Sequence, residues 1–450
     1  MRDLLIPANE LILKLFALDP GAKLSILDSS GRTLGGSRYL IAGFEPAESF
    51  EFNCRTQAEA FEVLEFLDEK LKFYQAGNKP TSFPLQFEGA CIATLSYDLG
   101  RLFENLSLHQ EHESGEPSAC LYFYDTLVVH DYQTGKTFIR GKREDEFAGI
   151  LKTQNFLIEK PLPAVSVTSN FEKSEYLAAI ERIREHIARG DIYQANLTQQ
   201  LRVEAENALS PERVFLHLRE NHPAPFAAFI RRESDVVVSA SPERFIKVLN
   251  SNPCSQNHRT VIAQPIKGTR PRGKTEAVDE QLRRELKTSE KDRAENVMIV
   301  DLLRNDIGRV CEFGSVAVEK LCELEEHPTL FHLVSTIRGK LKEETTVSDL
   351  LKAAFPCGSI TGAPKIRAMQ ILDAIETTPR GLSTGAIGYF GFDGSIDLSV
   401  AIRTAVIREN IATFNVGGGI TFDSNPEEEY AESLLKARAL LNAFCGNYSG

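Results

Sequence analysis

The chain has 450 residues, of which 42% are hydrophobic and 25% are charged, and its formal net charge is −12 at pH 7. This composition predicts a globular protein with a large buried core, and the negative charge argues against a general nucleic-acid binder. No run of about 18 apolar residues occurs, so we expect no membrane-spanning helix.

The N-terminal third of the chain combines helix and strand patterns. Residues 1–21 carry apolar side chains at helical spacing and resemble a first helix rather than a signal peptide. Residues 90–100 and 120–132 alternate as strands do. The eight cysteines show no metal-binding spacing. Together these features favour a cytoplasmic protein with reduced thiols.

A soft boundary follows this region. Residues 159–170 (EKPLPAVSVTSN) contain two prolines and a polar tail. We therefore expect an N-terminal subdomain over residues 1–165 and a second unit over residues 166–450. The second unit opens on a predicted helix that Ser174 caps and Gly190 ends, with an apolar stripe along one side.

The C-terminal half alternates strand-like runs with helices. Residues 385–407 predict a hairpin that turns at Asp393–Gly394. Its second arm is expected to continue as one strand through Arg403, with Ile396 and Ile402 on the opposite face. The expected fold class is therefore α+β, with helices packed against a large sheet.

Two predicted helices each begin with a pair of carboxylates. Ser289 caps the first, which carries Asp292 and Glu295, and a cap at Asn425 precedes Glu429 and Glu432. Residues three apart share one face of a helix, so four carboxylates on two helices could meet around Mg²⁺. For either pair alone, the simpler explanation is that the helix dipole favours acidic residues in a first turn.

Three further segments are candidates for ligand contact. Thr361 and Gly362 precede a helix whose free N–H groups could bind an anion, although the spacing is not that of a phosphate-binding loop. Gly417–Gly419 would let a ligand approach the backbone closely. Lys267, in PIKGTRPRG, could serve solubility, anion binding or nucleophilic attack. A capped helix start and a β-bulge are the structural alternatives for the first two segments.

In this order, the segments resemble the chorismate-utilising enzymes. Within that family the chain is most similar to the large component of aminodeoxychorismate synthases, and next to component I of anthranilate synthases. The resemblance implies two large β-sheets packed together and flanked by helices, with the active site in residues 166–450. The matching segments are GDIYQANLTQQ, SASPERF, PIKGTRPRG, KDRAENVMIVDLLRNDIGRV, FHLVSTIRG, PCGSITGAPK, AIRTAV and GGGITFDSNPEEEYAESLLKARALL. The N-terminal third matches more loosely.

The resemblance also implies how the substrate and a metal ion would be held. Glu295 and Glu432 would hold Mg²⁺, with Asp292 and Glu429 supporting it through water, and the ion would bind the ring carboxylate of chorismate. The side-chain carboxylate would be bound by Arg403 and by the backbone of Gly417, Gly418 and Gly419. The remaining contacts would come from Gln194, Gly268, Thr269, Thr361, Gly362 and Lys436.

Two residues carry the chemistry that the resemblance implies. Lysine at position 267 is typical of aminodeoxychorismate synthases, where anthranilate synthases usually have alanine. The neutral amine of Lys267 would attack ring carbon 2 as the 4-hydroxyl leaves, and ammonia would then add at carbon 4 and expel the lysine. Glu243 of SPERF would be the general acid that protonates the leaving hydroxyl. An electrostatic role for Lys267 and a salt bridge for Glu243 are the alternatives.

The implied activity is Mg²⁺-dependent amination of chorismate to 4-amino-4-deoxychorismate, in a cytoplasmic enzyme. Gln194 favours amination over hydration, because water-adding relatives have a lysine base at that position. No G-x-C-x-G nucleophile elbow is present, so ammonia would come from a glutamine amidotransferase partner. The alternatives are component I of an anthranilate synthase and, from another class, a non-catalytic chorismate-binding subunit.

The resemblance also bears on a possible regulatory pocket and on the shape of the substrate site. Asp28, Ser29 and Arg38 fall near the position where anthranilate synthases bind tryptophan, so they are candidates for such a pocket. Ordinary strand and turn residues are the alternative. Ser383 stands where family members often have an aromatic residue, and this difference bears on the shape of the substrate site.

Overall fold

A computed structural model describes residues 2–31, 37–77, 87–104, 106, 115–153, 164–250, 259–326 and 330–446. Part of the predicted boundary segment and Cys254 lie outside these ranges. The other seven cysteines are free thiols. None of the described helices combines the length and the apolar composition needed to cross a bilayer.

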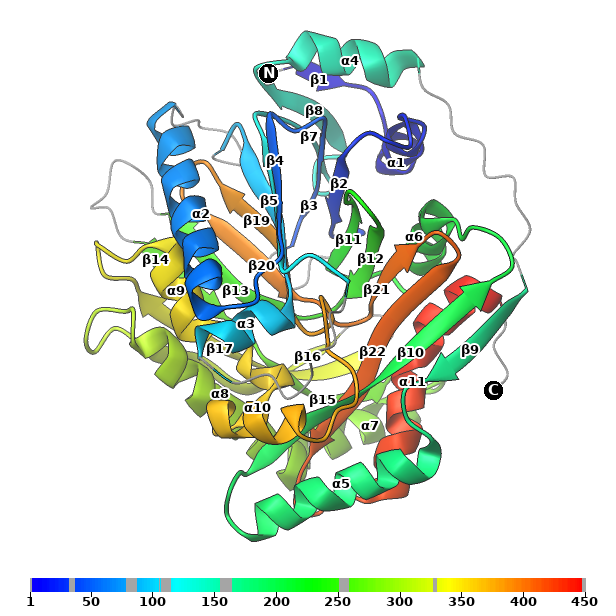
Figure 1. The fold of residues 1–450 in the computed structure, drawn as a ribbon, viewed down its shortest axis with the longest axis vertical. Helices are drawn as coiled ribbons and strands as arrows, with labels where there is room; N and C mark the ends of the chain where they lie inside the picture. The colour runs from blue at the N-terminus through cyan, green and yellow to red at the C-terminus, as the bar shows by residue number, and fades with distance from the viewer. Residues whose placement is uncertain are drawn as a thin grey trace.

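Two large antiparallel sheets form the centre of the molecule (Figure 1). The first sheet has twelve strands, in the spatial order β1 (Arg2–Leu4), β8 (Lys136–Gly141), β7 (Thr126–Asp131), β3 (Tyr39–Phe44), β2 (Leu24–Asp28), β11 (Phe226–Arg231), β12 (Val236–Ser241), β21 (Thr404–Arg408), β22 (Ile411–Ile420), β10 (Gln194–Ala205) and β18 (Gly362–Ala363), with β9 (Val165–Ser169) also paired to β10.

The second sheet has ten strands. Their order is β15 (Ile266–Pro271), β17 (Leu330–Lys340), β14 (Arg259–Ala263), β13 (Arg244–Asn250), β20 (Ile396–Val400), β19 (Ala386–Gly391), β5 (Ala90–Leu95), β6 (Ala119–Tyr124) and β4 (Glu48–Phe52), with β16 (Ala317–Glu326) also paired to β17. The two packed sheets and the α+β class are as predicted.

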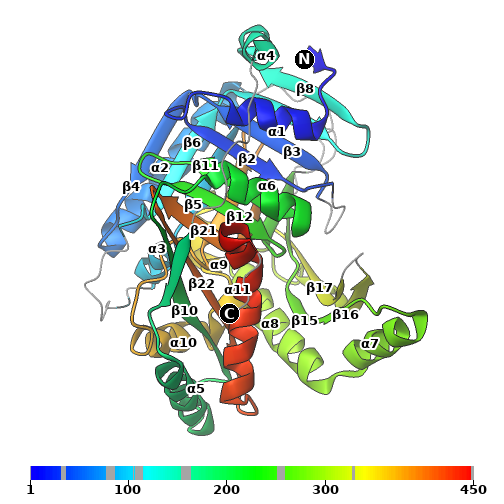
Figure 2. The same cartoon turned by 90° about the vertical axis from the view of Figure 1, so that its right-hand side faces the viewer.

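Helices cover the outer faces of both sheets. They are α1 (Ala8–Phe16), α2 (Gln57–Gly77), α3 (Tyr97–Phe103), α4 (Glu144–Thr153), α5 (Lys173–Ala188), α6 (Pro211–Asn221), α7 (Glu276–Thr288), α8 (Glu290–Gly308), α9 (Val347–Ala354), α10 (Lys365–Asp373) and α11 (Pro426–Cys445), with a 3-10 turn, η2, at Gly358–Ile360. Figure 2 shows α11 lying along β22 and β10.

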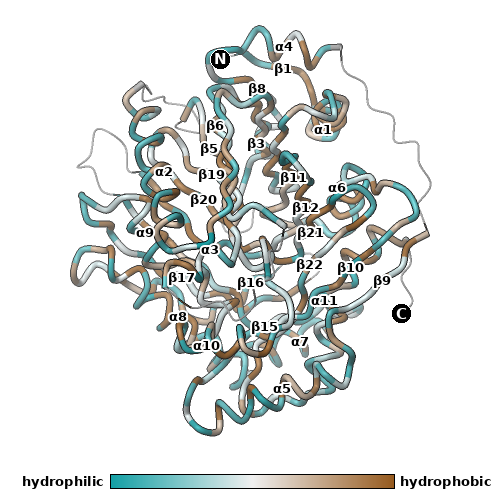
Figure 3. Tube along the Cα trace, in the orientation of Figure 1, coloured by the Kyte–Doolittle hydropathy of each residue, from teal (hydrophilic) through white to brown (hydrophobic). Residues whose placement is uncertain are grey.

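The core has three layers because the inner strands are buried on both faces. Along β5, Cys91 and Leu95 belong to the cluster under α2, α3, α8 and α9, whereas Ile92 belongs to the cluster between the sheets. This alternation follows from the two-residue period of a strand. A third cluster lies under α1, α6 and α11. Hydrophobic residues concentrate on the central strands, and hydrophilic ones on the outer helices and loops (Figure 3).

The two sheets take strands from both sides of residue 165. Strands β1–β8 precede that residue, and β10–β22 follow it. The division into a subdomain over 1–165 and a unit over 166–450 stays a prediction, but neither segment forms a sheet alone.

In the N-terminal third, residues 2–4 form a strand ahead of the predicted first helix, and residues 97–100, predicted as strand, belong to α3. Two local predictions for residues 166–450 are also wrong. Glu172, and not Ser174, is the N-cap of α5, because the side chain of Glu175 turns back to accept the Glu172 N–H at 2.8 Å. The arm predicted to run through Arg403 ends at Val400, and the chain crosses there to β21 in the other sheet. The turn at Asp393–Gly394 is confirmed, with β19 and β20 paired on either side of it.

Candidate active site

The proposed acid and the proposed nucleophile converge on one turn. Glu243 is buried between β12 and β13, where the chain passes from the first sheet to the second. The hydroxyl of Ser359, in η2, donates to Glu243 Oε1 at 2.7 Å. Lys267, the second residue of β15, is partly buried and donates from Nζ to the carbonyl oxygen of Ser359 at 3.3 Å. Both side chains are therefore held within one local network.

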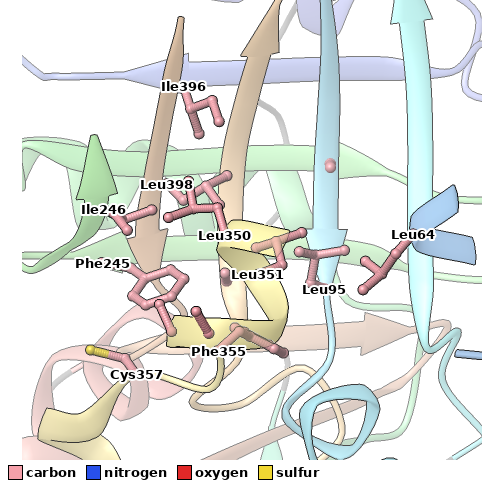
Figure 4. Close-up of a cluster of buried hydrophobic side chains, with 14 of the residues drawn as sticks. Leu64, Leu95, Phe245, Ile246, Leu350, Leu351, Phe355, Cys357, Ile396 and Leu398 are labelled. Atoms are coloured by element: carbon pink, nitrogen blue, oxygen red, sulfur yellow. The ribbon is translucent and has the colours of Figure 1, made fainter. Parts of the chain in front are cut away.

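Hydrophobic packing fixes the start of β13 against the segment that leads into this turn. The ring of Phe245 lies 5.9 Å from that of Phe355, centroid to centroid. Figure 4 shows these two rings and Cys357 in the same buried cluster. Glu243, two residues before Phe245, is thus anchored by the core of the second sheet.

The surroundings of Glu243 favour its protonated form. Burial raises the pKa of this carboxyl, while the Ser359 hydrogen bond, the Lys267 charge and the backbone N–H of Ile266 lower it, and the net shift is upward. A buried carboxyl with a raised pKa can hold a proton near neutral pH and release it to a leaving group.

The caps predicted for the two acidic helices are confirmed. The hydroxyl of Ser289 accepts from the N–H of Asp292 at 3.2 Å at the start of α8. The side chain of Asn425 accepts from the N–H groups of Glu427 and Glu428 at the start of α11. The carboxylate pairs therefore lie in the first two turns of their helices.

Each of these carboxylates except Glu295 is engaged by a neighbouring side chain. Asp292 pairs with Arg270 at 3.1 Å, and Glu432 pairs with Lys436 at 2.8 Å. Buried Glu429 accepts from the Ser424 hydroxyl at 2.6 Å. Within the described ranges, no three His, Cys, Asp or Glu side chains are arranged as a ready-made metal site.

Electrostatics nevertheless tie the two helices to one region. Burial raises the pKa of Glu295, and so do the nearby carboxylates of Asp292 and Glu429. The charges of Lys267 and Lys291 lower this pKa, but the net shift is upward. Carboxylates from α8 and α11 thus feel one another, and a divalent cation there would relieve their repulsion.

Glycines let the backbone approach these carboxylates. A Cβ on Gly268, whose φ is +81°, would lie 3.0 Å from the side chain of Asp292, and one on Gly418 would lie 3.1 Å from Glu429 Oε2. Carboxylate oxygens are the donors that Mg²⁺ prefers, so the chemistry of these residues fits this ion, although their side chains are not gathered into a metal site in this structure.

Gln194 is a buried side chain with unused hydrogen-bonding capacity. It is fully buried, and neither its Nε2 nor its Oε1 has a hydrogen-bond partner among the described residues. A Cβ on Gly419 would lie 2.2 Å from Gln194 Nε2, and Gln194 and Ala363 are opposite one another in β10 and β18. Buried amides without partners are costly, which marks this position as one that a ligand would satisfy.

Arg403 is a second group without a partner. It lies on the crossover between β20 and β21 with φ at +49°, and it forms no ion pair within the described part of the chain. Desolvation alone lowers its pKa. Val400, three residues earlier, donates its N–H to the carbonyl of Glu243 at 3.0 Å, so this crossover adjoins the proposed acid. A desolvated guanidinium suits a carboxylate ligand.

The remaining predicted contacts lie on neighbouring elements. The carbonyl of Thr361 accepts the N–H of Asn196 at 2.8 Å, and Lys436 Nζ donates to the carbonyl of Gly417 at 2.9 Å. The hydroxyl of Thr269 is 2.9 Å from Nδ1 of His332. Buried Ser383 accepts from the N–H of Asn415 at 3.0 Å. Strands β10, β15 and β22 and helices α8 and α11 therefore carry most of the predicted site.

Asp28, Ser29 and Arg38 lie elsewhere. They line a cavity of about 270 Å³ between the two sheets, together with Lys247 and Asp397 among others, and its lining includes neither Glu243 nor Lys267. These three residues line one cavity, apart from the proposed reacting groups, and the prediction that they bind tryptophan stays a prediction.

Sequence analysis missed Ser359 and His332. Both lie inside segments that were singled out, PCGSITGAPK and FHLVSTIRG, but no pattern in the sequence indicates that Ser359 contacts residues 92 and 116 positions away. Arg380 was missed for the same reason: it is fully buried and donates to the carbonyls of Asn196 and Ile360.

Comparison with known proteins supplies independent context. The family described as chorismate binding enzyme matches residues 26–442. Aminodeoxychorismate synthase component 1 of Escherichia coli (strain K12) is 40% identical over 359 residues, which cover 79% of this chain and 77% of that protein. The chloroplastic aminodeoxychorismate synthase of Arabidopsis thaliana is 38% identical over 411 residues, covering 85% of this chain but 44% of that protein.

Solved structures give the same architecture. The crystal structure of anthranilate synthase component I from Streptococcus pneumoniae TIGR4 superposes with a TM-score of 0.76 at 28% identity, covering 90% of this chain and 92% of that one. The chain spans about half the length of several curated relatives that it matches, including those of Arabidopsis, rice and Streptomyces griseus.

Proposed function

The chain belongs to the family of chorismate-binding enzymes, and from this membership we propose that it aminates chorismate at ring carbon 4 to give 4-amino-4-deoxychorismate. The observation that carries the proposal is that a lysine amine and a buried carboxyl form hydrogen bonds with the same residue of the η2 turn. Lys267 Nζ and Glu243 Oε1 both bond Ser359, at 3.3 and 2.7 Å. Nucleophilic and acid functions are thus available side by side.

In the first step, the neutral amine of Lys267 attacks ring carbon 2. The new bond from nitrogen to carbon forms as the ring double bonds shift and the bond from carbon 4 to its hydroxyl oxygen breaks. Glu243 donates its proton to that oxygen, which leaves as water, and the lysine nitrogen, now bonded to carbon 2, keeps both of its protons as an ammonium group. The raised pKa of Glu243 supports its role as the donor.

In the second step, ammonia adds at carbon 4 and the bond from carbon 2 to Lys267 breaks, so that the lysine leaves as a neutral amine. The new ammonium group at carbon 4 then returns one proton to Glu243. The net reaction converts chorismate and ammonia into 4-amino-4-deoxychorismate and water, and it regenerates the free amine. Two allylic displacements replace one difficult substitution, which is the general advantage of a covalent intermediate.

The substrate has two carboxylates, and the chain offers a separate site for each. Arg403 would bind the side-chain carboxylate, since its guanidinium is desolvated and unpaired among the described residues. Glu295 and Glu432, with Asp292 and Glu429, would hold Mg²⁺. When bound, the ion would bridge the ring carboxylate to the acidic helices and offset their charge.

Ammonia would come from a glutamine amidotransferase subunit. Several relatives carry the name component 1, which implies at least one further component in those proteins. The chain has no G-x-C-x-G elbow of its own. We expect turnover with ammonium salts by the chain alone, and turnover with glutamine only when a glutaminase subunit is added.

Component I of an anthranilate synthase is the second candidate, because a structure of that class superposes over most of the chain. Incubation with chorismate, Mg²⁺ and ammonium, followed by mass analysis of the product, separates the two. Aminodeoxychorismate supports the proposal, whereas fluorescent anthranilate and pyruvate would overturn it in favour of the second candidate.

Lys267→Ala tests the mechanism in the same assay. We expect it to lose most of the ammonium-dependent activity, whereas Lys274→Ala, which removes an exposed amine directly after the PIKGTRPRG segment, should keep it. Amination by Lys267→Ala at the wild-type rate would refute the covalent route and leave the substrate assignment standing.

A further inference from the structure

Ser359 occupies a rigid turn between α9 and α10. Its side chain is buried, and the turn is fixed on two sides. On one side, a Cβ on Gly358 would lie 2.5 Å from Leu302 of α8, so the backbone lies directly on that helix. On the other, the buried guanidinium of Arg380 donates to the carbonyl of Ile360 at 3.0 Å. The turn therefore cannot shift without disturbing the core.

Two polar groups of Ser359 point to two different partners. Its hydroxyl donates to Glu243 Oε1 at 2.7 Å, and its carbonyl accepts from Lys267 Nζ at 3.3 Å. The hydroxyl is also 3.3 Å from the sulfur of Cys357. Glu243 comes from the β12–β13 junction and Lys267 from β15, so one residue joins side chains from two separate parts of the chain.

The two groups suit two different tasks. A hydroxyl can donate to a carboxylate and accept from a carboxylic acid, so it can hold Glu243 in either protonation state. A carbonyl only accepts. An N–H of Lys267 must therefore face Ser359, and the lone pair of the neutral amine is turned away from it. Both contacts constrain orientation without taking part in bond making.

We propose that Ser359 is a positioning residue that fixes the Glu243 carboxyl through its hydroxyl and the Lys267 amine through its carbonyl, so that acid and nucleophile keep one mutual geometry through both steps. This inference rests on the proposed function. It adds to that function a residue that touches neither the substrate nor the reacting bonds.

The groups around Glu243 give the inference a pH signature. Lys267 and the Ile266 N–H face it from β15, and Ser359 and Cys357 face it from the turn. Burial, with the charge of Glu243, raises the pKa of the Cys357 thiol to about 12, so this thiol stays protonated in the working range. Because the Ser359 hydrogen bond lowers the pKa of Glu243, its removal should raise that pKa.

Ser359→Ala is the test, with Ser348→Ala as the matched control. Ser348 is equally buried, lies on α9, and its hydroxyl has no partner within the described ranges. In the ammonium reaction, we expect Ser359→Ala to lower kcat about 10- to 100-fold, as for a lost hydrogen bond to an ionisable group, with KM for chorismate within about threefold. The alkaline limb of the kcat profile, which reports a protonated acid, should move to higher pH. Ser348→Ala should match the wild type.

Ser359→Cys is the conservative variant, and it keeps the inference testable if Ser359→Ala does not fold. A thiol of similar size is a weaker donor, so we expect an intermediate kcat and a smaller shift of the alkaline limb. An unchanged kcat and pH profile in both variants would overturn the inference. A loss of kcat without movement of the limb would do the same, because it would indicate a merely structural role.

Failure of the inference differs from failure of the proposed function. If the wild type aminates carbon 4 and Lys267→Ala is inactive while Ser359→Ala behaves as the wild type, only the role of Ser359 is refuted. If the wild type makes anthranilate or no aminated product, the proposed function falls, and the role of Ser359 falls with it.

Discussion

Two polar regions of this molecule differ in how their arginines are paired. Around the cavity between the sheets, the charges are paired: Asp28 with Arg219 at 2.7 Å, Arg38 with Asp131 at 2.6 Å, and Arg244 with Asp397 at 2.8 Å. In the proposed active site, the amide of Gln194 and the guanidinium of Arg403 have no such partners among the described residues.

The difference indicates which region is built for a ligand that brings its own charge. A buried polar group without a partner costs free energy, and such groups persist where a bound molecule satisfies them. Paired groups stabilise the fold instead, and removal of one member leaves the other uncompensated. The tryptophan pocket predicted at Asp28, Ser29 and Arg38 stays a prediction. The carboxylates and guanidinium groups around this cavity pair with one another, whereas the hydroxyls of Ser29 and Ser37 in its lining have no partner among the described residues.

The largest effect on stability should come from the paired region. Asp28→Ala removes a fully buried carboxylate that accepts from Arg219, from Tyr132 and from the N–H of Ser30. Since it removes the counter-charge of the partly buried Arg219 guanidinium and leaves the Tyr132 hydroxyl without its acceptor, we expect the free energy of unfolding to fall by about 3–5 kcal/mol in urea titrations. The exposed Asp3→Ala should change it by less than about 0.5 kcal/mol.

The same variant tests whether the two regions are independent. At a temperature where Asp28→Ala is folded, kcat for the ammonium reaction should stay within about twofold of the wild type, as expected for well-separated sites. A collapse of kcat in the folded variant would break the comparison, because the cavity would then act on the reacting groups.

The next effect is on substrate binding, and unlike Asp28→Ala it should not lower the stability of the fold. Arg403→Gln removes the unpaired guanidinium, so binding of chorismate should weaken by about 2–5 kcal/mol, seen as a large rise in KM. Stability should stay equal or increase, because the fold no longer has to desolvate a partly buried cation that has no counter-charge among the described residues. Arg408→Gln is a suitable control, since Arg408 is two-fifths exposed and bonds Asp235.

A clear loss of stability in Arg403→Gln would contradict this view. It would mean that the guanidinium has a structural partner in the fold, and that its empty surroundings do not mark a substrate site. Equal KM values in the variant and the wild type would contradict it from the functional side.

Local sequence signals predicted the elements that local contacts determine. The caps at Ser289 and Asn425 and the turn at Asp393–Gly394 depend on residues within three or four positions of one another, and the structure has all three. The end of β20 at Val400 could not be predicted in this way. The apolar alternation continues through Ile402, and the chain leaves the strand because β21 pairs with β12 in the other sheet.

The candidate site shows the same division. Family resemblance located Glu243, Lys267 and the acidic helices in the sequence, but nothing in the sequence connects them to Ser359 or separates them from the Asp28 cavity. The sequence also does not show which charged side chains are paired. Arg38 and Arg403 are both arginines beside strands, yet Arg38 bonds a buried aspartate and Arg403 has no such partner among the described residues. That contrast depends on contacts across the whole chain.

The smallest effect on stability concerns Asp131, which pairs with Arg38 beside the cavity. Its dependence on pH should show that the charge of Asp131 is the cause. Burial raises the pKa of Asp131, but hydrogen bonds from Arg38, Thr134 and the N–H of Gln133 outweigh it and hold the pKa at about 2. Since this value lies below that of an unfolded aspartate, the ionised carboxylate stabilises the fold above about pH 4, and the contribution is lost as the pH falls through about 2.

Asp131→Asn should therefore lower the free energy of unfolding by about 1–2 kcal/mol at pH 7, discounted because Arg38 is one-third exposed. At pH 3, roughly half of that difference should remain in urea titrations. A difference that stays constant from pH 7 to pH 3 would show that packing, rather than charge pairing, is what Asp131 contributes, and the contrast between the two regions would then rest on Asp28 alone.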